Sequence, residues 1–347
     1  TMFSRKEVFT ERFLPRALPG RAAALDALSA VLSPATRGEP AGSCWEIGPS
    51  GAGKTSTARH LLEQLRVDYG IPFARVECVG STRWELLSAI AADHPRIAQH
   101  DGMGTAELLT LLDETVDDPF VVVLDEFDGL EAPAVLSDLT AIDAVSLVCI
   151  AHDREEAVDL VPEDATTLGS ARCIEFDPYG HDAMLDILRA RADTGLRPGV
   201  VDDDQLSRIA DEAAGSARYG VQSLRSAVEL GIERGHTEVT GADVEDAFEH
   251  ATERIREQLL ASLSRQHHIV YRIIREAGEE GIRPGAILEA YRERSEEPRS
   301  RQMVGNYRRK LERYDLVACE GDGSSRWDHW WAVDDQLTTP ATAQTRV

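Results

Sequence analysis

Lysine, long apolar runs and paired cysteines are all scarce in this sequence of 347 residues. Lysine occurs only at positions 6, 54 and 310, and the other 34 basic residues are arginines. No apolar run approaches the ~20 residues that a membrane-spanning helix needs, which excludes a membrane span. The first residues, TMFSRKEVFTERF, lack the apolar segment of a secretory signal. We therefore expect a cytoplasmic protein with no membrane association.

The five cysteines, at positions 44, 78, 149, 173 and 319, are scattered singly along the chain. Their spacing matches neither a zinc-binding pattern nor a disulfide framework. We expect them to be small buried hydrophobic residues in a reducing compartment, and we expect no cysteine-built metal site.

The net charge of −24, from 61 acidic and 37 basic residues, would ordinarily argue against a nucleic-acid partner. The charge is unevenly distributed, because residues 265–333 hold 13 basic and 12 acidic residues and leave −25 for the rest. An acidic, lysine-poor composition is typical of proteins from salt-accumulating organisms, where salt screens the self-repulsion. An ordinary acidic cytosolic protein is the alternative.

A chain of this length exceeds what one hydrophobic core usually organises, so more than one domain is expected. Residues 1–176 alternate short apolar runs with amphipathic stretches, which predicts an α/β domain with a parallel sheet and helices on both faces. The expected strands are Ser43–Ile47, Phe73–Cys78, Phe120–Asp125, Val145–Ile150 and Cys173–Phe176. The expected helices between them include Lys54–Val67, Trp84–Ala92 and Ala106–Val116.

Residues 177–250 show only helical patterns, broken by Pro198 and Gly215, as in a small helical domain. A further helix is expected from Ala251, followed by short helices and a glycine-rich hairpin at Glu320–Ser325, which makes residues 251–335 a third domain. The polar residues 336–347 are expected to form a disordered tail.

One segment fills the phosphate-loop pattern G-x-x-x-x-G-K-[ST] between an expected strand and an expected helix. Its glycines let the backbone amides turn toward phosphate oxygens, the lysine reaches the β- and γ-phosphates, and the threonine hydroxyl can bind magnesium. The residues predicted to bind nucleotide here are Gly48, Pro49, Ser50, Gly51, Ala52, Gly53, Lys54 and Thr55.

A second signal is the apolar strand VVVLDEFD, which ends in carboxylates. Such a strand delivers acids to the sheet edge where nucleotides bind. We expect Asp125 to hold Mg²⁺ and Glu126 to orient or deprotonate the attacking water. The Asp-Glu pair favours an AAA+ ATPase over a GTPase.

An ordered series of motifs resembles the archaeal replication initiators related to the eukaryotic origin-recognition subunit one and cell-division-control protein six. The series is Arg37-Gly38-Glu39-Pro40, GPSGAGKT, VVVLDEFD, Phe176-Asp177-Pro178-Tyr179, Ile187-Leu188-x-x-Arg191, Gly215-Ser216-Ala217-Arg218, and Glu289-Ala290-Tyr291-Arg292 to Leu316-Val317. The resemblance spans residues 12–333. It implies an AAA+ domain with a helical lid, followed by a C-terminal winged-helix domain.

The resemblance also implies roles for single residues. Tyr179 and Arg191 would contact the nucleotide from the base of the lid, and Arg218 would sense the γ-phosphate. Two departures argue for slow hydrolysis. His152 stands where the family usually has an asparagine sensor, and Ala165–Thr167 stands where an arginine finger for a neighbouring subunit is expected, with Arg172 as the nearest substitute.

The C-terminal domain carries the predicted DNA contacts. Ser300 can cap a helix whose apolar face is Met303, Val304, Tyr307, Leu311 and Tyr314. Basic residues 299, 301 and 308–310 fall in a stretch free of acids. The predicted DNA-binding residues are Arg299, Arg301, Gln302, Asn306 and Arg309, with Arg326 on the wing for the minor groove.

These observations together predict an ATP-regulated initiator that uses ATP/ADP and Mg²⁺ and binds double-stranded origin DNA, with the replicative helicase as a further partner. The chain is expected to be a monomer in solution or to assemble on DNA. Two alternatives stay open. One is a nucleotide-binding DNA regulator that does not initiate replication, and the other is a signalling ATPase whose winged helix binds protein.

Overall fold

The computed structural model describes residues 2–98, 102–321, 323, 325 and 327–339. The chain divides into two compact units, Thr1–Thr252 and Glu253–Val347. Among the described residues, no helix is long and apolar enough to cross a membrane.

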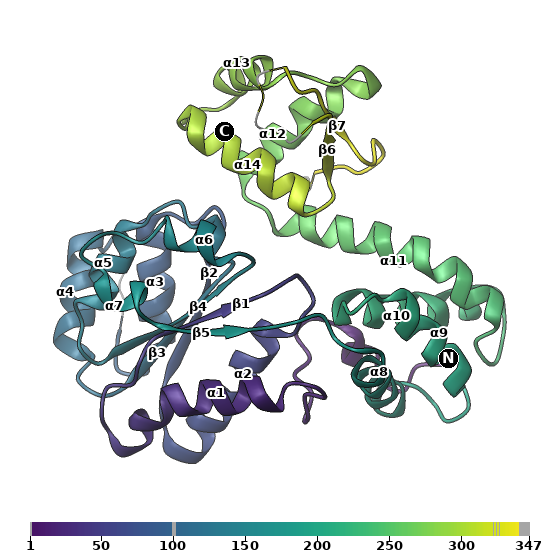
Figure 1. The fold of residues 1–347 in the computed structure, drawn as a ribbon, viewed down its shortest axis with the longest axis horizontal. Helices are drawn as coiled ribbons and strands as arrows, with labels where there is room; N and C mark the ends of the chain where they lie inside the picture. Colours follow the sequence, from purple (N-terminus) through teal and green to yellow (C-terminus); the bar gives the residue numbers. More distant parts are fainter. Residues whose placement is uncertain (1, 99–101, 322, 324, 326, 340–347) are drawn as a thin grey trace. The chain divides into compact units, whose positions relative to one another are not determined.

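The first unit is built on a five-stranded parallel sheet (Figure 1). Its strands are β1 (Cys44–Ile47), β2 (Phe73–Glu77), β3 (Phe120–Asp125), β4 (Val145–Ala151) and β5 (Arg172–Glu175), in the order β2-β3-β4-β1-β5. The predicted strands are confirmed to within one residue at each end. β3 lies between β2 and β4 and is buried along its whole length, as expected for a continuous apolar run in a parallel sheet.

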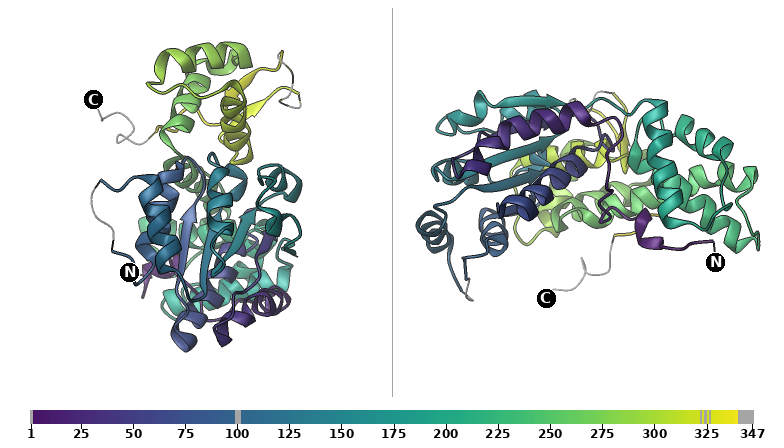
Figure 2. Two further views of the ribbon diagram at one scale, coloured as in Figure 1. Left: turned by 90° about the vertical axis from the view of Figure 1, so that its left-hand side faces the viewer. Right: turned by 90° about the horizontal axis from the view of Figure 1, so that it is seen from below.

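Helices cover both faces of this sheet, as the strand–helix alternation predicted (Figures 1 and 2). Alternate β3 residues point to opposite faces. Val121 and Val123 belong to the core under α1 (Ala22–Leu32) and α2 (Lys54–Tyr69), whereas Val122 and Leu124 belong to the core under the helices of the other face. Those helices are α3 (Arg83–Asp93), α4 (Thr105–Thr115) and α5 (Ala134–Thr140), and the short α6 (Arg154–Val158) and α7 (Thr166–Gly169) precede β5.

Three helices follow the sheet and share a separate core. They are α8 (His181–Gly195), α9 (Asp203–Glu212) and α10 (Ala217–Glu233). Pro198 and Gly215 lie in the connections between them, as predicted. The N-terminal segment completes this core with Met2, Val8 and Phe9, which are buried among the three helices.

The helix α11 runs without interruption from Gly241 to Ser262. The prediction of a new helix from Ala251 is therefore wrong. No glycine or proline stands between Ala242 and Ser262 to end the helix, so the chain continues through the point where the two compact units divide.

After α11, the described part of the second unit consists of α-helices and a two-stranded antiparallel hairpin (Figure 1). The helices are α12 (Arg265–Glu276), α13 (Pro284–Arg294) and α14 (Arg301–Arg313), and the strands are β6 (Val317–Cys319) and β7 (Trp330–Ala332). Their core is aromatic, because the side chains of Tyr271, Tyr291, Tyr307 and Trp330 are fully buried. The prediction of a disordered tail from residue 336 is wrong at Leu337, which is buried and whose carbonyl oxygen accepts a hydrogen bond from Arg275 at 2.7 Å. Residues 340–347 of that tail lie outside the described part.

Candidate functional site

The phosphate loop lies between β1 and the first turn of α2, the position that its pattern predicts. Gly48, Gly51 and Gly53 have φ angles of 153°, 75° and 85°, a region that L side chains rarely adopt. A Cβ on Gly51 would stand 2.3 Å from the Ser216 hydroxyl oxygen, and one on Gly53 would stand 2.2 Å from the Tyr179 hydroxyl oxygen. The glycines are therefore required both by the backbone and by the residues packed over the loop.

Lys54 is buried at the start of α2, and its ammonium group is held by the loop itself. Nζ donates hydrogen bonds to the carbonyl oxygens of Gly48 at 2.6 Å and Pro49 at 2.8 Å. Burial lowers the pKa of Lys54 to about 8, against the opposing effect of the nearby Asp125 and Glu46 carboxylates. The Lys54 amine therefore loses its charge only slightly above neutral pH, in a loop that is predicted to bind phosphates.

Thr55 and Asp125, the two predicted magnesium ligands, are in direct contact. The Thr55 hydroxyl donates to the two Asp125 carboxylate oxygens, at 3.2 and 3.1 Å. Arg75 on β2 donates to the same carboxylate from Nε at 3.0 Å and from Nη2 at 2.8 Å. The sequence analysis missed Arg75, whose role depends on the register that pairs Glu77 on β2 with Asp125 on β3.

The two predicted catalytic residues follow adjacent strands. Glu126 follows β3 with φ 53° and ψ 45°, a left-handed conformation that is strained for a residue other than glycine. Its backbone N–H donates to Asp125 Oδ1 at 3.1 Å. His152 follows β4, the strand that pairs with both β3 and β1. The parallel sheet therefore brings both residues to the edge that holds the phosphate loop.

Glu46, in β1 beneath this loop, is a further group that the sequence analysis missed. Its side chain is fully buried, and among the described residues neither carboxylate oxygen accepts a hydrogen bond. Burial, reinforced by the negative charge of Asp125, raises its pKa well above the usual range. The sequence predicts Glu46 only as part of an apolar strand, and no local pattern distinguishes it from an acid that faces solvent.

Arg21 ties the residues before α1 to the loop and to the start of the helical part. Its guanidinium donates to the carbonyl oxygens of Ala52 at 2.8 Å and Asp177 at 2.7 Å. The same group stacks on the Tyr179 ring, 3.7 Å from its centroid. Tyr179 is buried, and its hydroxyl group lies over Gly53. Arg21 was not predicted, because its partners stand 31 and 156 residues away in the sequence.

The two arginines of the helical part differ in their contacts. Arg218, in the first turn of α10, donates to the Ser50 hydroxyl at 3.3 Å and pairs with Glu11 at 2.9 Å. Arg191, on α8, donates to the Val8 carbonyl oxygen and stacks on Phe13 at 4.6 Å from the ring centroid. Burial lowers the pKa of Arg191 to about 10. The structure thus brings Arg218 to the phosphate loop and Arg191 to the N-terminal segment.

The predicted DNA-binding residues of the second unit lie on and before α14. Ser300 caps the helix, accepting the Met303 N–H at 3.3 Å, as predicted. Three of these residues, Arg301, Gln302 and Arg309, are exposed, and Asn306 accepts a hydrogen bond from Arg309 at 2.7 Å.

The remaining basic residues of this stretch differ from that exposed group. Arg299 is half-buried, 3.8 Å from Glu297. Arg326 lies outside the described residues. Lys310 was counted in the basic stretch, but it is buried over the Tyr314 ring and does not join the exposed face.

The sheet order, the phosphate loop, the acidic end of β3 and the following helices define a P-loop ATPase. The AAA domain family matches residues 37–157, and the Cdc6 AAA+ ATPase-type lid domain family matches residues 185–249. An ORC1-type DNA replication protein of Halobacterium salinarum, numbered 9, is 32% identical over 99% of this chain and 97% of its own length. A second protein of that organism, numbered 1, is 32% identical over 88% of this chain and its whole length.

A solved structure titled as the Aeropyrum pernix ORC1 protein in complex with DNA superposes with a TM-score of 0.73. It is 26% identical and covers 97% of this chain and 95% of that chain. The Aeropyrum pernix ORC2 protein shares the fold at 21% identity, with a TM-score of 0.65 over 96% of this chain and 94% of that chain. The chain belongs to the ORC1/Cdc6-type family of AAA+ replication initiator proteins.

Proposed function

We propose that this protein is an ATP-regulated initiator that binds duplex origin DNA through a C-terminal winged-helix domain, residues 251–335. Family membership supports the initiator role. The DNA-bound state of the Aeropyrum pernix relative supports a DNA partner. Helicase loading stays a prediction.

The residues around the phosphate loop fit Mg²⁺–ATP. Positive φ angles at three glycines allow the loop to curl so that its backbone amides can face a phosphate, and α2 begins there with its positive end. Lys54 and Arg218 would hold the phosphates, and Thr55 and Asp125 would hold the metal ion. Bound Mg²⁺ would neutralise charge on the phosphates during transfer to water.

One observation carries the proposal that ATP acts as a switch. Arg218 is on α10, yet its guanidinium contacts Ser50 in the phosphate loop. A guanidinium that binds the terminal phosphate from the helical part would make the position of α8–α10 depend on ATP rather than ADP. Glu126 would activate the water, and His152 would replace the amide sensor, which supports slow turnover.

Fluorescence anisotropy tests the proposal. The intact protein, with ATP or ADP, is titrated with origin-proximal and scrambled duplexes in molar potassium chloride, where the Debye length is ~3 Å and the acidic surface is screened. We expect the wild type to bind the origin-proximal duplex more tightly with ATP than with ADP, and more tightly than it binds the scrambled duplex. This preference for the origin-proximal duplex should be lost in Arg301→Ala/Arg309→Ala. The control, Arg265→Ala/Arg294→Ala, removes the same charge from exposed pairs with Glu296 and Glu276 and should bind like the wild type.

Each alternative predicts a different outcome. Equal affinity for both duplexes, or an unaffected Arg301→Ala/Arg309→Ala variant, would favour a winged helix that binds protein. Selective binding without occupancy of replication origins in cells would favour a regulator that does not initiate replication. Arg218→Ala should make the DNA affinity measured with ATP equal to the DNA affinity measured with ADP. Arg208→Ala, on the surface of α9, should keep the difference between the two.

A further inference from the structure

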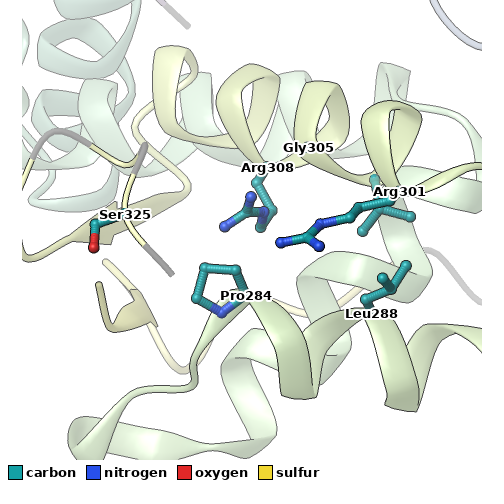
Figure 3. A pocket seen from close by; sticks show the side chains of 7 residues that line it. Pro284, Leu288, Arg301, Gly305, Arg308 and Ser325 are labelled. Atoms are coloured by element: carbon teal, nitrogen blue, oxygen red, sulfur yellow. The ribbon is translucent and has the colours of Figure 1, made fainter. Parts of the chain in front are cut away.

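The second unit contains a pocket of about 170 Å³ between α13 and α14. Its lining includes Pro284 and Leu288 from α13, Arg301, Gly305 and Arg308 from α14, and Ser325. Figure 3 shows both arginine side chains extending from α14 into this space, with the Arg301 guanidinium pointing toward Arg308, which lies two turns further along the helix. We call this space the two-arginine pocket.

The two arginines lack the counter-charges that some other arginines of this unit have. Arg265 and Arg294 are each paired with a glutamate, whereas within the described part of the chain neither Arg301 nor Arg308 is ion-paired. The Arg308 Nη1 atom is buried and makes no hydrogen bond to any described residue. Two arginines that line one pocket without an ion-paired carboxylate are the arrangement expected of an anion site.

Arg308 is held in place by its surroundings. Its guanidinium lies over the Trp330 ring, 4.8 Å from the centroid, and the residue is half-buried. Burial, together with the positive charges of Arg309 and Arg301, lowers its pKa. The nearby Asp328 opposes this effect, but its carboxylate already accepts the Ser325 N–H at 3.0 Å.

Gly305 in α14 independently indicates that a ligand enters the two-arginine pocket. It stands inside α14, where glycine weakens a helix relative to alanine. Its φ is not positive, and a Cβ there would meet only Arg308 Nη2, at 3.9 Å. Neither backbone conformation nor packing within the described chain therefore requires glycine. Its absent side chain leaves the wall of the two-arginine pocket open to a ligand.

We propose that the two-arginine pocket binds one phosphate group of the DNA backbone; this inference rests on the proposed function and refines it. Backbone phosphates protrude from a duplex and can enter a recess, whereas base edges stay stacked inside the grooves. Planar guanidiniums match the oxygens of a phosphodiester, and the apolar Pro284 and Leu288 exclude water around it. Arg301 therefore positions the duplex together with Arg308, and base selection falls to the exposed Gln302 and Arg309 and the partly exposed Asn306.

The test uses the full chain and duplexes in which single phosphates are replaced by neutral methylphosphonates. We expect one phosphate position at which replacement weakens wild-type binding about tenfold and has no effect on Arg308→Gln. Arg301→Gln and Arg308→Gln should each lower the affinity for the specific and the scrambled duplex by the same factor. Each should also reduce the slope of log affinity against log salt concentration by about one. Arg309→Gln, the matched control, should instead change the ratio between the two duplexes.

Gly305→Ala keeps every charge and guards against a folding artefact. It should keep or raise the melting temperature of the protein. It should also lower the affinity for both duplexes, because the new methyl group narrows the pocket. If the wild type binds no duplex, the proposed function fails. If the wild type binds DNA but Gly305→Ala and Arg308→Gln bind equally well, only the pocket assignment is overturned. Saturable binding of inorganic phosphate to the free protein, with DNA affinity unchanged in Arg308→Gln, would also overturn it.

Discussion

Arg75 and Asp125 form a two-bond contact at the heart of the candidate site, from Nε and Nη2 of the guanidinium to one carboxylate oxygen. The carboxylate is almost fully buried, with 6% of its side chain exposed, and it also accepts from Thr55. The residue expected to hold magnesium is thus already neutralised by a strand neighbour. Metal binding has to compete with this ion pair.

The first prediction concerns that competition. Arg75→Gln leaves a buried carboxylate without its cation, so the free energy of unfolding without ligand should fall by about 2 kcal/mol, less than the ~3–5 kcal/mol of a fully buried pair because 33% of the Arg75 side chain is exposed. Mg²⁺–ATP should then raise the melting temperature more than it does in the wild type. Arg66→Gln, which removes an exposed pair with Glu63, should change either value little. Identical ligand-induced shifts in Arg75→Gln and wild type would contradict the prediction.

The second prediction is a pH dependence of nucleotide binding. Because the pKa of Lys54 is about 8 in the free protein, the amine is charged below that pH and neutral above it. Phosphates favour the charged form, so binding takes up a proton, and affinity should fall up to tenfold per pH unit above about 8.

Calorimetry at pH 7 and pH 9 measures this dependence. Lys54→Ala should lose most of the affinity at both values. Lys54→Arg should retain a pH-independent remainder, because a guanidinium stays charged throughout. A wild-type affinity that is the same at pH 7 and pH 9 would show that Lys54 does not titrate in this range.

The third prediction separates chemistry from strain at Glu126. Glu126→Gln should abolish the slow hydrolysis while sparing ATP binding, because an amide cannot take a proton from water. Glu126→Gly should also abolish hydrolysis, but it relieves a left-handed backbone that disfavours other residues by ~1–2 kcal/mol. Its melting temperature should therefore match or exceed that of the wild type. Single-turnover hydrolysis and thermal melts check both variants, and turnover of several per second by the wild type would refute slow hydrolysis.

The fourth prediction concerns acid stability and Asp243 at the start of α11. Burial alone would raise its pKa, but hydrogen bonds from the Thr240 N–H, His236, the Thr240 hydroxyl and Arg234 lower it to about 2. A lowered carboxyl pKa contributes stability that is complete above about 3.8 and is lost as the pH falls toward 2, here about 2 kcal/mol.

Urea unfolding of wild type and Asp243→Asn measures that contribution. The difference between the two should be largest above pH 4 and should shrink as the pH falls. Asp246→Asn, which removes an exposed partner of the same Arg234, serves as the control. It should lower the free energy of unfolding less than Asp243→Asn does above pH 4. A difference that is constant with pH would show that the Asp243 charge contributes nothing.

Much of the first unit could be predicted because its signals are local. Each strand is an apolar run bounded by turns, and the phosphate loop is a fixed spacing of glycines before a lysine. Arg21, Arg75 and Glu46 could not be predicted, because their roles arise from strand register and from contacts across the chain. The same limit explains Lys310, which was counted with its basic neighbours although its helical position points it into the core.

In the second unit, the helix starting at Arg301 could be predicted from its cap and its apolar spacing. The pocket that Arg301 and Arg308 share could not. The sequence predicts the two residues only as separate members of a basic stretch, and the pocket depends on where α13 places Pro284 and Leu288. Gly305 gave a weak signal in the sequence, as a glycine inside a helical pattern.

The scarcity of lysine has a practical consequence for labelling this protein. Lys54 and Lys310 are 8% and 5% exposed, whereas the side chain of Lys6 is 56% exposed and pairs with Glu229 on α10 at 2.9 Å. A reagent that acylates side-chain amines would therefore modify Lys6 first. A fluorophore attached there would sit beside α10, the helix that also carries Arg218, and could report nucleotide exchange without an introduced cysteine.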